Sequence, residues 1–162
     1  MFVDLADISK RTSADVLALI SLLHGLDASL DVTLGLNEHE ARVLHDRLVG
    51  PGRSPSAGHD AIEAVCEGLF AAVGIGCIVV HPVDSSCAVT RAGCVVRPGR
   101  RIARPLASTG GGDNFNAGYC RARGLGMDQS DALDCGMAVS RLYVSTGRSP
   151  DLDQVIADLS AP

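Results

Sequence analysis

Hydrophobic positions along this chain follow two spacings in turn, which predicts an alternation of strands and helices. Short apolar runs bounded by turn residues are typical of buried strands, whereas apolar residues three and four positions apart mark one face of a helix. Strands are expected at residues 1–4, 31–35 and 76–81, with a hairpin built from residues 87–90 and 94–97. Helices are expected at residues 13–24, 38–48, 59–73, 112–123, 129–143 and 152–159. This order predicts an α/β fold with a largely parallel sheet and flanking helices.

The segments between these elements are loops and turns, with no sign of a linker to a second domain. Asp128 is expected to cap the helix that begins at residue 129, and the stretch Gly-Pro-Gly-Arg-Ser-Pro-Ser-Ala-Gly at residues 50–58 is a loop by composition. Ser85 and Ser86 are expected in a plain turn after the strand at 76–81. We find no internal repeat, low-complexity tract or linker, so we expect a single domain over residues 1–162.

Composition narrows the classes of function. With 162 residues, 46% of them hydrophobic, and a mean hydropathy of +0.21, the chain can bury a core. A net charge of −5, 3% aromatic residues and no tryptophan argue against nucleic-acid binding. No apolar run is expected to reach the roughly 20 residues that span a bilayer. Because the N-terminus also lacks the pattern of a signal peptide, we expect a cytoplasmic protein with no membrane partner.

The cysteines are spread along the chain without the spacing of a known metal or redox motif. No Cys-x-x-Cys pair is present, and the five histidines are not spaced with the cysteines as zinc ligands. We therefore expect reduced thiols that act mostly as small buried apolar residues, with a metal or disulfide role as the alternative. The six are Cys66, Cys77, Cys87, Cys94, Cys120 and Cys135.

The tract Ser-Thr-Gly-Gly-Gly-Asp-Asn-Phe-Asn-Ala-Gly-Tyr at residues 108–119 carries the main chemical signal. Three glycines allow successive backbone N–H groups to point at one spot, and the residues that follow have the spacing of a helix. A helix N-terminus favours an anion, so this turn is expected to bind a phosphate. Asp113 lies at the same place, and its carboxylate is expected to act as a base beside that phosphate. The alternative is an ordinary turn at a helix start. The phosphate-loop pattern that ends in Gly-Lys is absent, because the only lysine is Lys10.

A second signal lies in Leu-Gly-Leu-Asn-Glu-His-Glu-Ala-Arg-Val-Leu, residues 34–44. Asn37 follows a short buried strand and can cap the next helix, while Glu40 lies three residues on, as in a capping box. A role in the cap alone is one reading of the pair. The other reading is a role in a site at the carboxyl ends of the strands, where ligands of such sheets bind.

Both tracts resemble motifs of the ribokinase/PfkB sugar kinases. The family signature D-T-x-G-A-G-D-x-F-x-A-G is matched at Gly110, Gly112, Asp113, Phe115, Ala117 and Gly118. Asn37 and Glu40 match the family segment L-N-x-x-E-A, in the expected order along the chain. Gly111 replaces the usual alanine. Ala107 replaces an aspartate that helps to hold a monovalent cation in the family, so the resemblance leaves that cation doubtful.

The resemblance implies a three-layer, ribokinase-like (Rossmann-like) sheet with flanking helices and transfer of a phosphoryl group from ATP to a sugar-like hydroxyl. It implies that Asp113 takes the proton of the hydroxyl and that the N–H groups of Gly110, Gly111 and Gly112 bind the transferred group. Nucleotide and Mg²⁺ contacts are implied at four further positions, with Glu40 reaching the metal through water. These positions are Asn37, Glu40, Thr109 and Asn116.

The resemblance covers only part of the family fold. Residues 1–11 resemble its mid-chain strand, so the chain resembles the C-terminal half, without the N-terminal half and the lid. Pro82 and Ser85 occupy positions that are usually glycine in the nucleotide turn. The alternative function is therefore a non-catalytic remnant that binds nucleotide or a protein partner. An exposed sheet edge predicts a possible homo-oligomer.

A cluster of four arginines and two single histidines can each be interpreted in two ways. The cluster before the glycine turn is expected to be a solvated hairpin exit, with a phosphate clamp as the alternative. His39 and His81 are expected to be surface or turn residues rather than catalysts. The arginines are Arg97, Arg100, Arg101 and Arg104.

Overall fold

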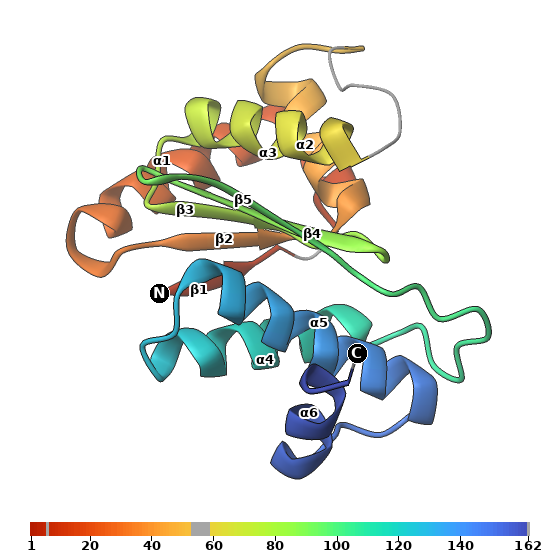
Figure 1. Cartoon of the computed structure of the whole chain (residues 1–162). Coiled ribbons are helices and arrows are strands. Elements are labelled where there is room, and N and C mark those ends of the chain that lie inside the picture. Colours follow the sequence, from red (N-terminus) through yellow and green to blue (C-terminus); the bar gives the residue numbers. More distant parts are fainter. Residues whose placement is uncertain (6, 53–58, 162) are drawn as a thin grey trace. The chain divides into compact units, whose positions relative to one another are not determined.

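The computed structural model describes residues 1–5, 7–52 and 59–161 (Figure 1). The strands are β1 (Phe2–Asp4), β2 (Thr33–Leu36), β3 (Cys77–Val80), β4 (Ser85–Thr90) and β5 (Gly93–Pro98). The helices are η1 (Ile8–Lys10), α1 (Ser13–Leu30), α2 (Glu38–Leu48), α3 (His59–Val73), α4 (Gly111–Gly124), α5 (Gln129–Thr146) and α6 (Leu152–Leu159). The alternation of strands and helices that the hydrophobic pattern predicts is confirmed.

The five strands form one mixed sheet in the order β1-β2-β3-β4-β5. β1, β2 and β3 run parallel, with Asp4 opposite Gly35 and Leu36 opposite Val80. β4 runs antiparallel to β3, with Cys87 opposite Val80. The prediction of an α/β sheet is confirmed, and the parallel part consists of the first three strands because the chain returns directly through β4 without a crossover helix.

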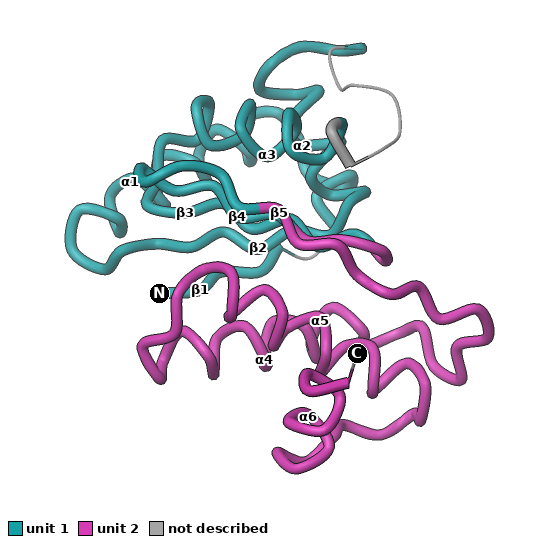
Figure 2. The backbone as a smooth tube through the Cα atoms, viewed as in Figure 1, with its two compact units in different colours: residues 1–82, 87–95 teal, residues 83–86, 96–162 magenta. Residues whose placement is uncertain are grey.

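The chain divides into two compact units, which Figure 2 shows in two colours. Unit 1 comprises residues 1–82 and 87–95, and unit 2 comprises residues 83–86 and 96–162. Each unit is described by itself below.

Unit 1 packs its helices through apolar faces and small residues. Val65, Cys66 and Leu69 of α3 are fully buried, as predicted from their spacing. α2 meets α3 where His45 packs over Gly68: a Cβ at Gly68 would lie 2.7 Å from Nε2 of His45. Burial lowers the pKa of His45, so the ring is neutral at pH 7 and serves as part of the packing.

Unit 2 is built around the close approach of α4 and α5. A Cβ at Gly118 would lie 2.8 Å from the carbonyl oxygen of Cys135, and a Cβ at Gly136 would lie 2.8 Å from the ring of Phe115. The two glycines therefore let the helices approach each other where larger side chains would separate them. α6 joins this pair through an ion pair of Arg141 with Asp158.

Two expectations about element boundaries were wrong. α1 continues past residue 24 to Leu30, so Gly25 does not break the helix; Asp31 ends it in the left-handed conformation, with φ of 46°. Ser85 and Ser86 do not form a plain turn; they begin β4 and are buried. Six of the loop residues predicted at 50–58, residues 53–58, lie outside the described residues.

The longer α1 also changes the expectation about apolar length. Its 18 residues have a mean hydropathy of 1.3, and by length and composition alone the helix could cross a membrane. The share of the helix that is buried is 11%. Core helices of soluble proteins and signal sequences meet the same criterion, so one such helix near the N-terminus is a weak indication of a membrane span.

Gly118→Ala tests the α4–α5 contact. The new Cβ would collide with backbone of α5, which has little freedom to move, so we expect a loss of about 1–3 kcal/mol in the free energy of unfolding. Urea denaturation measures this loss.

Gly124→Ala is the matched control, because Gly124 lies in the same helix and a Cβ there would meet nothing within 4 Å. Alanine has the higher helix propensity at both positions, so the control should keep or gain stability. Equal stability of the two variants would contradict close packing at Gly118.

Candidate active site

Asn37 and Glu40 form a complete capping box at the start of α2. The Asn37 side chain accepts a hydrogen bond from the Glu40 N–H at 2.9 Å, and Oε2 of Glu40 accepts one from the Asn37 N–H at 3.0 Å. The structural reading of this pair is therefore confirmed. The cap uses Oε2 of Glu40, so the second carboxylate oxygen can still accept a hydrogen bond or bind a cation.

Asp4 is a neighbour of this pair that the site prediction missed. It ends β1 opposite Gly35, two residues before Asn37, so the parallel register brings both strand ends to one edge. Burial raises the pKa of Glu40, the hydrogen bond from Asn37 lowers it in part, and the negative charge of Asp4 raises it further. The sequence shows an acidic residue at the end of the first expected strand, but its proximity to Glu40 depends on how the strands pair.

The donors at this edge fit Mg²⁺. Mg²⁺ prefers oxygen ligands and keeps several of its waters, so it is usually held by one or two carboxylates. A cation beside Glu40 would offset both the burial of its charge and the repulsion from Asp4. The predicted role of Glu40 toward Mg²⁺ through water is therefore chemically reasonable in this setting and stays a prediction.

His81 follows β3 at the same end of the parallel strands. Its N–H donates to the carbonyl oxygen of Leu36 at 3.0 Å, and burial lowers the pKa of its ring to about 4. The ring is therefore neutral at pH 7. His39, in the first turn of α2, is exposed.

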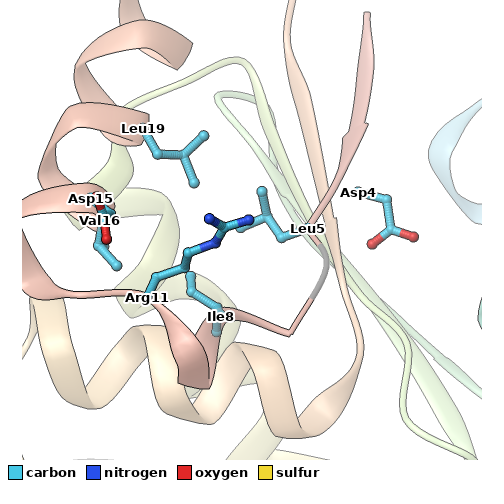
Figure 3. A pocket seen from close by; sticks show the side chains of 7 residues that line it. All are labelled: Asp4, Leu5, Ile8, Arg11, Asp15, Val16 and Leu19. Atoms are coloured by element: carbon cyan, nitrogen blue, oxygen red, sulfur yellow. The ribbon is translucent and has the colours of Figure 1, made fainter.

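A cavity of about 330 Å³ lies between the end of β1 and the start of α1 (Figure 3). Four apolar side chains and the guanidinium of Arg11 line it, while Asp4 points away on the far side of β1 (Figure 3). Asp15 is held by the capping box of α1, where it accepts from the N–H and the hydroxyl of Thr12. The lining residues are Asp4, Leu5, Ile8, Arg11, Asp15, Val16 and Leu19.

In unit 2, the glycine tract forms the start of α4 as predicted. Gly110 precedes the helix with φ of +91°, a left-handed conformation that favours glycine. A Cβ at this position would lie 2.8 Å from Oη of Tyr143, whose hydroxyl donates to the carbonyl oxygen of Thr109. The carbonyl of Gly110 accepts the first helical hydrogen bond, from the Asn114 N–H at 3.1 Å.

This start has no side-chain cap. The N–H groups of Gly111, Gly112 and Asp113 lie in the first turn, where no helical carbonyl precedes them, so they can bind an anion. Asp113 is exposed at the third helical position. Within the described residues, its carboxylate makes no hydrogen bond and no ion pair, which leaves it able to accept a proton from a bound group.

The other predicted residues of this tract are placed differently. Thr109 is exposed in the turn before α4, next to the anion-binding N–H groups. Asn116 lies in the second turn of α4 and its amide oxygen is buried, so it faces the packing of the helix. Its predicted contact with the nucleotide has less support than that of Thr109.

The arginine cluster is mostly accounted for by structure. Arg97 forms a two-pronged ion pair with Asp134 of α5, at 2.9 and 2.7 Å, which favours a structural role over a phosphate clamp. Arg100 donates to the carbonyl of Ala161. Arg101 and Arg104 are exposed, as expected for a solvated hairpin exit.

The chain is similar to known proteins along nearly its whole length. The family model of prokaryotic ketohexokinase matches residues 1–161. The chain belongs to the prokaryotic ketohexokinase family. A ketohexokinase of Haloferax volcanii is 29% identical over 157 residues, which cover 97% of this chain and 40% of that protein. The predicted kinship with sugar kinases is confirmed.

Solved structures confirm the ribokinase-like fold of this ketohexokinase-family chain. A ribokinase of Thermotoga maritima superposes with a TM-score of 0.71 at 19% identity, over 99% of this chain and 48% of the other. Phosphofructokinase-2 of Escherichia coli gives 0.69 at 15% identity, over 98% and 46%. A ribokinase II of E. coli, solved with ATP and Mg²⁺, gives 0.60 at 19% identity, over 91% and 44%. The chain thus spans about 40% to half the length of these relatives.

The predicted site residues of this ketohexokinase-family chain fall into two sets. Asn37 and Glu40 belong to unit 1 and are in direct contact. Thr109, the three glycines, Asp113 and Asn116 belong to unit 2. The roles of both sets in binding and catalysis stay predictions.

Glu40→Gln tests whether Glu40 is kept at a cost to stability. Its pKa is raised above the ordinary value of 4.5 on folding, so the folded chain binds the proton more tightly than the unfolded chain. The free energy of unfolding therefore falls as the pH rises through this window. Gln can still accept from the Asn37 N–H, so the variant should gain stability relative to the parent as the pH rises above the ordinary glutamate value of 4.5.

Urea denaturation across this pH range measures the difference. Glu38→Gln is the control, because it removes a carboxylate from the same helical turn but also breaks an ion pair with Arg42. It should show no such gain. A Glu40→Gln variant that loses stability at neutral pH would contradict the expected cost.

Proposed function

We propose that this chain supplies the phosphoryl-transfer part of a ketohexose kinase that uses ATP. The observation that carries the proposal is the start of α4, where unpaired N–H groups and an exposed carboxylate adjoin one another. A helix start held open by glycine, without a side-chain cap, suits a phosphate better than it suits stability alone.

Asp113 would act as the general base. As the sugar oxygen bonds to the γ-phosphorus of ATP and the bond to ADP breaks, the carboxylate accepts the hydroxyl proton. The N–H groups of Gly110, Gly111, Gly112 and Asp113 would bind the charge on the transferred group. One such donor typically stabilises a transition state by about 2.7–4 kcal/mol.

Glu40 and Asn37 would position Mg²⁺, with Asp4 adding negative charge to the same edge. When bound, Mg²⁺ supplies charge neutralisation for the phosphates. Glu40 would hold its waters with the oxygen left over by the cap, and Asn37 keeps that carboxylate oriented. The E. coli ribokinase II was solved with ATP and Mg²⁺, which supports Mg²⁺ as the metal of the proposed reaction.

The family name supports a ketohexose as acceptor, with the kinase acting in the cytoplasm where ATP is present. The hydroxyl group must lie beside Asp113, whereas the contacts that select the sugar are not assigned to residues of this chain. The most direct test of the proposal is whether this chain alone phosphorylates a ketohexose.

A non-catalytic binding protein is the second candidate. Pro82 follows β3 at a position that is usually glycine in the family, and it has no N–H to offer a nucleotide. Leu17 and Leu22 of α1 are 62% and 59% exposed, and β1 is an edge of the sheet. These features favour association, including self-association, over catalysis by the isolated chain.

Asp113→Asn separates the two candidates. If the chain is a kinase, transfer of phosphate from Mg·ATP to fructose should fall by roughly 10²–10⁴-fold, the contribution of a positioned base. Binding of Mg·ATP, measured by calorimetry, should persist because the N–H groups remain. The rate of ADP release in the presence of fructose is the activity readout.

Asp128→Asn is the matched control. Asp128 caps α5 through its side chain, and Asn caps a helix equally well, so both activity and folding should be unchanged. Transfer at the parent rate by Asp113→Asn would refute its role as base. Mg·ATP binding without transfer by the parent chain would favour the non-catalytic candidate.

A further inference from the structure

Two carboxylates and a thiol converge in unit 1, apart from the residues discussed above. Glu63 and Glu67 lie one turn apart on α3 and so share one face of the helix. Cys94 lies on β5. Their ligand atoms, one carboxylate oxygen from each glutamate and the sulfur of Cys94, all lie within 4.8 Å of one another.

A second thiol lies beside this group. Sγ of Cys87, on β4, lies 3.5 Å from Sγ of Cys94. Two thiolates on one tetrahedral zinc ion, each at about 2.3 Å, are separated by about 3.7 Å, so the observed spacing is close to that of a shared ion. Cys66 differs from both, because its thiol faces the carbonyl oxygens of Ile78 and Cys87.

In the part of the chain that the structure describes, no positive side chain pairs with the two glutamates of this group. Two glutamates four residues apart repel each other on a helix. The sulfur of Cys94 lies within 4.8 Å of a carboxylate oxygen of each glutamate. A cation among these groups would reverse each of these unfavourable interactions.

The group is closed on its inner side and open on its outer side. Cys87 is buried, Glu63 and Cys94 are half-buried, and Glu67 is exposed. An ion could therefore arrive from solvent past Glu67 and contact the thiols behind it.

We propose that Glu63, Glu67 and Cys94 form a binding site for a divalent ion of the zinc type, with the thiol of Cys87 beside it. Mixed oxygen and sulfur donors suit Zn²⁺, whereas Mg²⁺ and Ca²⁺ take oxygen ligands alone. These three donors leave the fourth position of a tetrahedral ion to a water or to the thiol of Cys87. Each thiol releases its proton to solvent when it binds the ion.

This site would tie α3 to the β4–β5 hairpin. An ion that binds the folded chain and not the unfolded chain raises stability by mass action. The site is therefore structural, and it is independent of whether the chain transfers phosphate.

Titration with Co²⁺, a spectroscopic substitute for Zn²⁺, tests the proposal on the full chain with its thiols reduced. One equivalent of Co²⁺ should produce thiolate-to-cobalt charge-transfer absorption, and Zn²⁺ should displace it. Cys94→Ser and Glu67→Gln should each weaken metal affinity by at least about tenfold, the loss seen even for outer-shell partners. Glu67 is exposed, so its variant should fold normally, and circular dichroism checks this.

Cys120→Ser is the matched control, because Cys120 is a half-buried thiol on α4 in unit 2. It should bind Co²⁺ as the parent does. The parent should also resist alkylation of Cys94 when Zn²⁺ is present. No charge-transfer absorption, equal affinity of the parent and Glu67→Gln, or equal alkylation of Cys94 with and without Zn²⁺ would each overturn the proposal.

Discussion

The parallel pairing of β1 with β2 and of β2 with β3 is the constraint on which the candidate site in unit 1 depends. It places Asp4, Asn37 and His81 after the ends of three neighbouring strands. A slip of one residue between β1 and β2 would turn Asp4 to the opposite face of the sheet. Gly35 helps to hold this pairing, since any Cβ there would collide with the ring of Phe2. The raised pKa of Glu40 therefore rests in part on a contact between two strands.

The helix starts of this chain show two different uses of the same backbone groups. α1, α2, α5 and α6 begin with a side chain that accepts from the first turn, and such a cap contributes about 0.5–2 kcal/mol to stability. α4 begins with Gly110 and has no such cap. Because these four starts meet the need for stability with side chains, the open N–H groups of α4 are better explained by a ligand. The same comparison explains why the capping box of α2 cannot by itself identify a site.

Local signals in the sequence were enough for most of the fold. The bounds of α2 and α6 agree with those expected, because an acceptor side chain before each helix marks its start. The end of α1 could not be found in this way, since Gly25 breaks helices in some settings and is tolerated in others. Asp4 was missed for another reason. Its proximity to Glu40 arises from strand pairing, and nothing in the local sequence records which strands are neighbours.

The contacts of the cysteines also depend on strand pairing, and the sequence could predict only part of them. Cys66 and Cys77 are buried in unit 1, as expected for small apolar residues. Cys87 and Cys94 carry no more of a motif in the sequence, but they lie on adjacent strands of a hairpin, with their sulfurs 3.5 Å apart. The two glutamates of the group come from α3, at least twenty residues earlier in the chain. A metal motif in a single segment repeats at short spacing, whereas ligands gathered by a sheet and its covering helix leave no such pattern. The absence of Cys-x-x-Cys therefore excluded only one way of building a metal site.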